Sequence, residues 1–253
     1  MKYFLSIDQG TTSSRAIIFN SNLEPILDAQ REYDLDYPND GWVELNPQDV
    51  LETVLASLEQ VLAEDIDIEA CGITNQRETT IVWSKSSGKP IYPGIVWQDR
   101  RTHEFCNELK LKGIEDSIKN KTGLVLDPYF SATKIKWILD NVEGAREQAE
   151  NGDLLFGTVD SYLIYMLSKE KNHFTDVTNA SRTLLFNINT MEWDNELLDL
   201  FEIPRSMMPV VLSCDGDFGL ININNHKIPI KGVIGDQQAA LVGQSCFKRG
   251  DMK

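Results

Sequence analysis

A run of polar residues, DQGTTSSR at positions 8–15, follows directly on a short apolar segment. Gly10 allows a tight turn and lets the backbone approach a ligand closely. The hydroxyl groups, the backbone N–H groups and the guanidinium of Arg15 are the donors that a phosphate requires, and Asp8 is set back far enough to reach Mg²⁺ through water. The run indicates a phosphate-binding hairpin, and an ordinary hairpin with a polar turn is the open alternative.

A cation and an anion stand side by side at Arg77 and Glu78, where a second apolar segment ends within GITNQRETT, residues 72–80. Neighbours on a strand point to opposite faces, but at a strand end or a bulge both side chains can reach one cleft. A donor beside an acceptor suits two neighbouring hydroxyl groups of a polyol. A surface ion pair in a turn is the competing interpretation.

A third candidate, Asp236, lies in GDQQAAL at residues 235–241, directly after the apolar segment 228–234. An Asp between a strand and a helix is often only an N-cap. Gly235 permits a sharp turn, however, that would project the carboxylate into a cleft. There it could accept the proton of a hydroxyl group, as an Asp does in other phosphoryl transfers.

Two aromatic residues lie beside these polar segments. Trp97 precedes QDRR at residues 98–101, and Tyr129 lies in DPYF at residues 127–130. Aromatic residues of this kind are more often part of a core than of a binding site, so the pattern alone leaves both interpretations open.

The hydrophobic pattern predicts the elements that must position these residues. Asn46 and Pro47 are typical of a helix start, and the helix is expected to end near Ala63. Strands are predicted at residues 3–7, 15–19, 25–33, 70–74, 79–83 and 228–234, with an extended segment at 91–97. Further helices are predicted at 100–111, 131–141, 144–150 and 158–167, from a cap at Asp194 through Leu200, and from a cap at Asp236 through about Gly243. Residues 222–227 are expected to form a loop.

This order of elements predicts an α/β chain with a mixed sheet and flanking helices. The first two strands must be antiparallel because the turn between them is short. Strand and helix units alternate afterwards, which favours crossover connections and parallel pairs.

The composition excludes several classes of function. The 253 residues carry a net charge of −15 without a basic cluster, which argues against nucleic-acid binding. No segment approaches the roughly 18 apolar residues of a membrane span, and the start turns acidic too early for a signal peptide, so we expect a cytoplasmic protein. The chain has no Walker A motif and no dinucleotide-binding glycine loop, and its four cysteines form no CxxC pair.

Eight segments together resemble one enzyme family. They are DQGTTSSRA, GWVELNP, GITNQRETTIVW, IVWQDRRT, DPYFSATKIKWIL, LLFGTVDSYLI, TNASRTLLFNI and GDQQAAL. In this order, from residue 6 to about 243, they are similar to the segments of glycerol kinases within the FGGY family of carbohydrate kinases. NQRETT followed by IVWQxRR is the most specific part. The resemblance implies the ribonuclease-H-like, actin-like ATPase fold, with residues 1–253 as the N-terminal domain.

The resemblance also assigns expected roles, position by position. Thr11, Thr12, Ser13 and Arg15 would contact the phosphates of ATP, and Asp8 and Asp236 would lie near Mg²⁺. The glycerol site would comprise Arg77, Glu78, Trp97, Tyr129, Asp236 and Gln237. Asp236 would be the general base, and Trp97 would cover the carbon chain of glycerol.

Similar enzymes continue into a second domain of like fold, which would supply the adenosine pocket and a second aromatic wall. We therefore expect residues 1–253 to be the substrate-binding half, able to fold but with little or no kinase activity alone, because one wall of a cleft cannot exclude water. A homo-oligomer of the full-length enzyme remains compatible with the sequence. Two alternatives stay open: a kinase for another polyol or a ketose, and a non-catalytic actin-like binding module.

Overall fold

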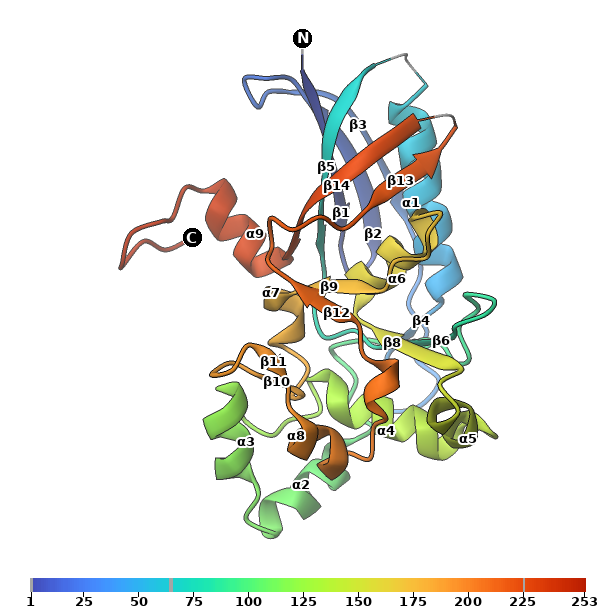
Figure 1. Ribbon diagram of the computed structural model, residues 1–253, viewed down its shortest axis with the longest axis vertical. Coiled ribbons are helices and arrows are strands. Elements are labelled where there is room, and N and C mark those ends of the chain that lie inside the picture. The colour runs from blue at the N-terminus through green and yellow to red at the C-terminus, as the bar shows by residue number, and fades with distance from the viewer. Residues whose placement is uncertain (1, 64–65, 225) are drawn as a thin grey trace.

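A six-stranded mixed sheet forms the upper part of the molecule in Figure 1, in a computed structural model that describes residues 2–63, 66–224 and 226–253. Its strands, in spatial order, are β13 (Leu220–Ile223), β14 (His226–Gly235), β5 (Ile68–Asn75), β1 (Tyr3–Gln9), β2 (Ser13–Phe19) and β3 (Pro25–Glu32). The strands β1, β2 and β3 are antiparallel neighbours, whereas β1 pairs with β5, and β5 with β14, in parallel. The mixed sheet with an antiparallel start is therefore confirmed.

The register brings three carboxyl-terminal strand ends together at one edge of the sheet. Asp8 near the end of β1 lies opposite Thr74 of β5, and Asn75 at the end of β5 lies opposite Gly235 at the end of β14. Ligands of open α/β sheets bind beyond such carboxyl ends. A ligand-binding site is therefore expected among the residues that follow β1, β5 and β14.

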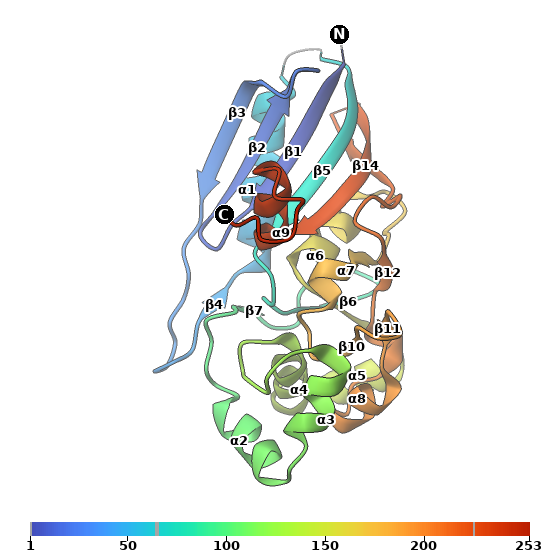
Figure 2. The same ribbon diagram turned by 90° about the vertical axis from the view of Figure 1, so that its left-hand side faces the viewer.

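Helices cover one face of this sheet. The helix α1 (Pro47–Val61) packs on β2 and β3, and α6 (Val159–Leu167) packs on β5 and β13. Alternate residues such as Leu5 and Ile7 are buried beneath them, whereas Asp8 on the other face is exposed. In Figure 2, α1 lies behind the strands, whereas α9 (Asp236–Gly243) stands in front of them toward their lower ends. The face opposite α1, on which Asp8 is exposed, is called the open face below.

The start of α1 shows why the local sequence folds as predicted. The side chain of Asn46 accepts a hydrogen bond from the backbone N–H of Gln48 at 3.0 Å, and Pro47 occupies the first helical position. Val50, Val54 and Leu58 then fall on one buried face. The predicted cap and apolar stripe are both confirmed, and the helix ends at Val61.

The lower part of the molecule has its own apolar core and is mainly helical (Figure 1). Its helices are α2 (His103–Leu111), α3 (Glu115–Thr122), α4 (Ser131–Asn141), α5 (Ala145–Glu150) and α8 (Asn195–Leu200), with a short 3₁₀ helix at Arg205–Met207. The remaining elements are α7 (Val177–Ala180) and four two-stranded pairs: β4 (Glu44–Leu45) with β7 (Gly94–Ile95), β6 (Ile81–Ser84) with β8 (Leu154–Gly157), β9 (Phe174–Asp176) with β12 (Val210–Leu212), and β10 (Phe186–Asn187) with β11 (Glu192–Trp193).

Two predictions about local structure are wrong. The expected loop at residues 222–227 is instead the connection of a hairpin, because Asn222 pairs with Lys227 and Ile223 with His226 across β13 and β14; residue 225 lies outside the described part. Asp236 is not the N-cap of the last helix: Gly235 takes that position, and Asp236 is the first helical residue. The carboxylate of Asp236 accepts a hydrogen bond from the adjacent backbone N–H of Gln237 at 2.7 Å and is partly exposed.

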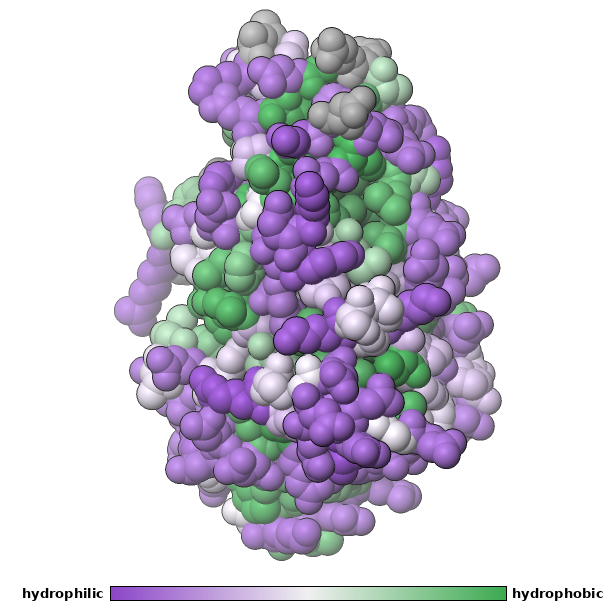
Figure 3. Space-filling model, turned by 45° about the vertical axis from the view of Figure 1, so that its right-hand side comes forward, coloured by the Kyte–Doolittle hydropathy of each residue, from purple (hydrophilic) through white to green (hydrophobic). Residues whose placement is uncertain are grey.

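The surface agrees with the acidic, polar composition. Figure 3 shows hydrophilic residues over most of the visible face, with hydrophobic ones in separate patches between them. Within the described ranges, none of the helices is both long and apolar enough to cross a bilayer.

Candidate functional site

Arg77, Glu78 and Asp236 meet just beyond the carboxyl ends of β5 and β14. The Nε atom of Arg77 lies 3.3 Å from Oδ1 of Asp236 and 4.0 Å from Oε1 of Glu78. The side chains of Arg77 and Glu78 are only 10% and 2% exposed, so the interpretation as a surface ion pair is wrong. Asp236, at 43% exposed, closes this group on the solvent side.

Glu78 is held in an uncommon backbone conformation that turns its carboxylate inward. Its φ is +62°, in the left-handed region that non-glycine residues rarely adopt. Its carbonyl oxygen accepts hydrogen bonds from Ser131 Oγ at 3.2 Å and from Lys134 Nζ at 3.3 Å, both on α4. Burial raises the pKa of the Glu78 carboxyl, against the opposing influence of Arg182, Arg77 and Lys134.

Asp236 is positioned by the end of β14. The backbone N–H of Gly235 donates to Thr178 Oγ1 at 2.8 Å, and that hydroxyl donates in turn to the buried carboxylate of Asp176 at 2.6 Å. A Cβ atom at Gly235 would lie 2.5 Å from Cδ of Arg77. The glycine is therefore needed for the close approach of Arg77 to the start of α9.

Trp97 and Tyr129 form an aromatic wall beside this group. Their rings lie 5.5 Å apart at an angle of 57°. Partial burial raises the pKa of Tyr129, and the charge of Glu78 adds to the effect. Trp97 also donates a hydrogen bond from Nε1 to Thr11 Oγ1 at 3.1 Å, so the wall is joined directly to the polar hairpin.

The segment after Trp97 is fixed by a buried ion cluster. The side chain of Arg101 is fully buried, pairs with Asp99 and Glu44 at 2.8 Å each, and lies 3.8 Å from the ring centroid of Trp42. Asp99 also accepts from the backbone N–H of Val43 at 2.7 Å. Because the charges of this cluster pair with one another, they are not available to a ligand. The QDRR segment therefore acts as a scaffold that holds Trp97 in place.

The tip of the β1–β2 hairpin is tight and braced from beneath. The N–H of Gly10 donates to the carbonyl of Ser13 at 2.8 Å. The carbonyl of Gly10 accepts from Tyr33 Oη at 2.7 Å and from Gln76 Nε2 at 3.1 Å. Thr12 is exposed, and Thr11 and Ser13 are partly exposed, so the hydroxyl-bearing residues lie on the accessible side of a fixed turn.

Asp8 and Arg15 lie opposite each other on the open face of the sheet. Partial burial of the Asp8 carboxyl raises its pKa, the negative charge of Asp236 raises it further, and Arg15 opposes both. The guanidinium of Arg15 donates to Asp28 at 3.0 Å, so it is turned toward β3 and away from the hairpin tip.

Asp8 and Asp236 suit a magnesium ion by their chemistry. In the described part of the chain, no group of three or more His, Cys, Asp and Glu side chains is arranged to hold a metal. Mg²⁺ keeps several waters and is commonly held by one or two carboxylates together with substrate phosphates. Two carboxylates on an open face, with the charge of Asp236 close enough to raise the pKa of Asp8, meet that requirement.

Three residues of this region escaped sequence reasoning. Gln238, not the exposed Gln237, accepts a hydrogen bond from Arg77 Nη1, at 3.2 Å. Arg182 contacts Glu78, and the fully buried Lys134 contacts the backbone of Glu78 and Tyr129. Arg182 lies within TNASRTLLFNI and Lys134 within DPYFSATKIKWIL, two of the segments that carry the resemblance. Their place in these segments is the signal in the sequence that could have pointed to them.

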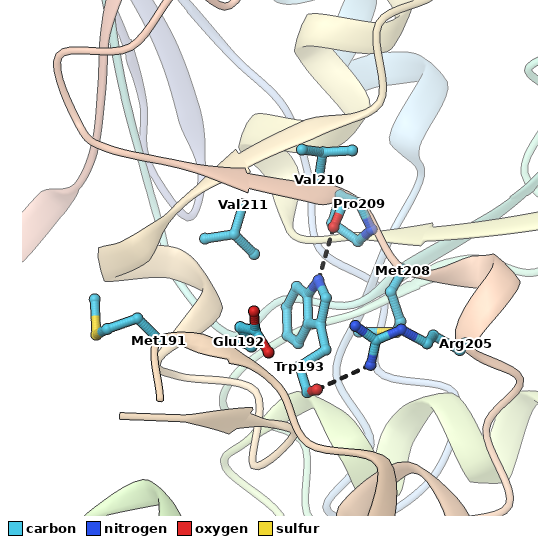
Figure 4. Close-up of a pocket in the computed structure, with 8 residues that line it drawn as sticks. All are labelled: Met191, Glu192, Trp193, Arg205, Met208, Pro209, Val210 and Val211. Atoms are coloured by element: carbon cyan, nitrogen blue, oxygen red, sulfur yellow. Dashed lines mark hydrogen bonds between the residues drawn. The ribbon is translucent and has the colours of Figure 1, made fainter. Parts of the chain in front are cut away.

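A surface hollow of ≈ 420 Å³ lies elsewhere, near β11 and β12 (Figure 4). Two of its polar side chains are paired within the protein: Trp193 Nε1 donates to the carbonyl of Pro209 at 2.7 Å, and Arg205 donates to the carbonyl of Trp193 at 2.9 Å. The sequence-predicted site residues are not among those that line it.

Comparisons with known proteins identify the family of this chain. The profile of the FGGY family of carbohydrate kinases, N-terminal domain, matches residues 3–243. A glycerol kinase of Alteromonas mediterranea is 57% identical and one of Fusobacterium nucleatum is 54% identical, each matched along all of this chain. The chain spans 52% of the length of either relative.

Solved structures show the same fold. The glycerol kinase of Plasmodium falciparum with ADP superposes with a TM-score of 0.95 at 35% identity, over 99% of this chain and 51% of its own. A xylulose kinase of Lactobacillus acidophilus, at 22% identity, reaches a TM-score of 0.86 over 97% of this chain and 50% of its own. The actin-like α/β fold is thereby confirmed, and the chain belongs to the FGGY family of carbohydrate kinases.

Proposed function

We propose that this chain forms the glycerol-binding part of a glycerol kinase, which transfers the γ-phosphoryl group of ATP to glycerol and yields sn-glycerol 3-phosphate. The observation that carries the proposal is the meeting of Arg77, Glu78 and Asp236 beside the Trp97–Tyr129 wall. Two relatives above 50% identity that are named glycerol kinase support it.

The group suits a small polyol. The guanidinium of Arg77 can donate to one hydroxyl and the carboxylate of Glu78 can accept from the next, while the aromatic wall covers the carbon chain. Gln237 is exposed next to Asp236, where its amide is accessible to the same ligand. An apolar wall with a few convergent polar groups is typical of small-molecule sites.

Asp236 is the proposed general base. Phosphoryl transfer passes through a loose transition state, so the protein mainly positions the reactants and neutralises charge. The carboxylate of Asp236 would orient the attacking hydroxyl and take its proton, an effect worth about 10²–10⁴ in rate.

The hairpin is the proposed phosphate site. Thr11, Thr12 and Ser13 offer hydroxyl and backbone donors, and Arg15 would turn from Asp28 toward the phosphates when the nucleotide binds. These local donors allow a chain with a net charge of −15 to bind an anion. Asp8 and Asp236 would hold Mg²⁺, which, when bound, neutralises charge on the phosphates.

Residues 1–253 would form one domain of a two-domain enzyme. We propose that a second domain closes the cleft over this site and supplies the adenosine pocket, and that the protein works in the cytoplasm, where ATP is available. Closure of this kind excludes water from the reacting phosphate. The chain alone is then expected to bind substrates weakly and to turn over slowly.

Substrate turnover tests the proposal. The protein that carries this chain, at the full length of its relatives, should phosphorylate glycerol with MgATP at a higher kcat/KM than xylulose, gluconate or longer polyols. A higher value for another of these substrates, or binding of glycerol without any phosphoryl transfer, would overturn the proposal. In the same assay, residues 1–253 alone should show little activity.

A further inference from the structure

We propose that Arg182 is a positioning residue, which acts on the ligand through Glu78 by fixing one carboxylate oxygen and leaving the other for a substrate hydroxyl. The inference rests on the proposed function, because the ligand that Glu78 would receive is glycerol. It concerns a residue after α7, far along the chain from the Arg77–Glu78 pair.

The contact between Arg182 and Glu78 is short and largely shielded from water. Nε of Arg182 donates to Oε1 of Glu78 at 2.6 Å, with side chains that are 24% and 2% exposed. Hydrogen bonds between two charged groups are the strong ones, and a buried carboxylate without a partner is costly. Arg182 is therefore the main charge partner of Glu78.

Arg77 does not fill this role, although it is the neighbour in sequence. Its Nε atom is 4.0 Å from Glu78, closer to Asp236 at 3.3 Å, and makes no well-aligned hydrogen bond within the described structure. Its Nη1 atom is directed to Gln238. Arg77 is thus directed to Asp236 and Gln238, whereas Arg182 is the hydrogen-bonded partner of Glu78.

The two oxygens of Glu78 are used unequally. Oε1 takes the hydrogen bond from Arg182, and among the described residues Oε2 accepts none. A carboxylate anchored at one oxygen cannot rotate freely, so the direction of the second oxygen is fixed. A polyol hydroxyl is the kind of donor that this second oxygen would accept.

Arg182 is itself held in place. Its backbone N–H donates to the carbonyl of Asn179 at 3.0 Å, and the next carbonyl, of Thr183, accepts from Ala132 at the start of α4 at 2.8 Å. The guanidinium lies 4.9 Å from the ring centroid of Phe130 and 5.8 Å from that of Tyr129. Cation–π contacts at these distances restrain the side chain. One guanidinium therefore joins the aromatic wall to the substrate-binding carboxylate.

Steady-state kinetics of two substitutions in the full-length protein test the inference. Arg182→Gln should raise the KM for glycerol about 10- to 100-fold, the loss expected for one charge-assisted hydrogen bond, with little change in kcat or in the KM for MgATP. Arg182→Lys keeps the charge but loses the planar fork, so it should restore part of the affinity for glycerol. If Arg182→Gln fails to fold by thermal melting, Arg182→Lys still carries the test through a smaller increase in the same KM.

Arg146→Gln is the matched control, because it removes an ion pair with Asp140 in the lower part of the molecule. A merely structural role of Arg182 would lower kcat, or raise both KM values together, and would overturn the inference. Unchanged kinetics of Arg182→Gln in an active protein would overturn the inference alone. A parent protein that does not phosphorylate glycerol would overturn the proposed function and this inference with it.

Discussion

The Nε atom of Arg77 lies 3.3 Å from Oδ1 of Asp236, which joins the segment after β5 to the first turn of α9. The contact exists because β5 and β14 are adjacent and parallel, so that both segments leave the sheet at the same edge. Parallel strands bring their carboxyl ends to one edge of the sheet, and ligands of open α/β sheets bind beyond such ends. The proposed general base and the proposed substrate-binding pair therefore share one site although they are distant in sequence.

Replacement of the proposed base should separate catalysis from folding. Asp236→Asn in the full-length protein should lower kcat by about 10²–10⁴ and change the KM for glycerol far less, because the amide keeps the shape but takes no proton. The fold should persist, since Gly235 rather than Asp236 caps α9. Asp217→Asn, which removes an exposed partner of Lys231, is the control. A kcat within a few-fold of the parent would contradict the assignment.

Gly235 allows the closest approach in the site. Its φ of −60° suits any residue, but a Cβ atom there would lie 2.5 Å from Cδ and 2.8 Å from Cγ of Arg77. Gly235→Ala should therefore displace Arg77 and lower kcat/KM for glycerol about 10- to 100-fold.

The matched control is Gly243→Ala, at the end of the same helix, where a Cβ atom would meet nothing within 4 Å. It should leave the kinetics unchanged. Equal kinetics for the two alanine variants would show that Arg77 tolerates the displacement.

Most of the scaffold could be predicted from local patterns. The hairpin, the Asn46 cap and the helix at residues 131–141 depend on short-range turn chemistry and periodicity, and the structure confirms them. The predicted start of α9 is off by one residue because both Gly and Asp are acceptable N-caps. In the structure Gly235, whose N–H donates to Thr178, occupies the cap position.

The less predictable part of the site depends on contacts between distant segments. Lysine is rarely buried, so nothing local indicates that Lys134 is enclosed; its position follows from the carbonyls of Glu78 and Tyr129, which it bonds. Arg182 reaches Glu78 only because α7 packs against β14 beside the carboxyl end of β5. A short motif cannot encode such a pairing, since it requires the sheet order.

The hydrogen bond from Trp97 Nε1 to Thr11 Oγ1, at 3.1 Å, predicts that the aromatic wall and the phosphate hairpin act together. Trp97→Phe keeps a ring but removes the donor, and Thr11→Val removes the acceptor. Each should raise the KM for MgATP about 3- to 10-fold, the range for one neutral hydrogen bond. The double substitution should raise the KM for MgATP by less than the product of the two single increases, because both substitutions remove the same contact. Fully multiplicative effects would show that the two residues act independently.

Lys134 should make the stability of the chain depend on pH. Burial lowers its pKa to about 7 from an ordinary value of 10.5. Between these values the unfolded chain binds a proton that the folded chain does not, so the free energy of unfolding rises with pH; below pH 7 both states are protonated and the cost of the buried charge is constant. Relative to Lys134→Met, the parent should therefore gain on the order of 2 kcal/mol between pH 7 and pH 9.

Denaturant unfolding of the parent and of Lys134→Met across this pH range measures the difference in their free energies of unfolding. Groups that titrate alike in the two proteins cancel in this difference. Lys134→Met should also be less stable overall at pH 9, because the carbonyl of Tyr129 loses its donor at 2.6 Å. Lys136→Met, on the same helix but with its ammonium ion-paired to Glu202, controls for the loss of a lysine. Parallel pH profiles for the parent and Lys134→Met would mean that Lys134 stays charged in the folded chain, stabilised by Glu78 and the carbonyls around it.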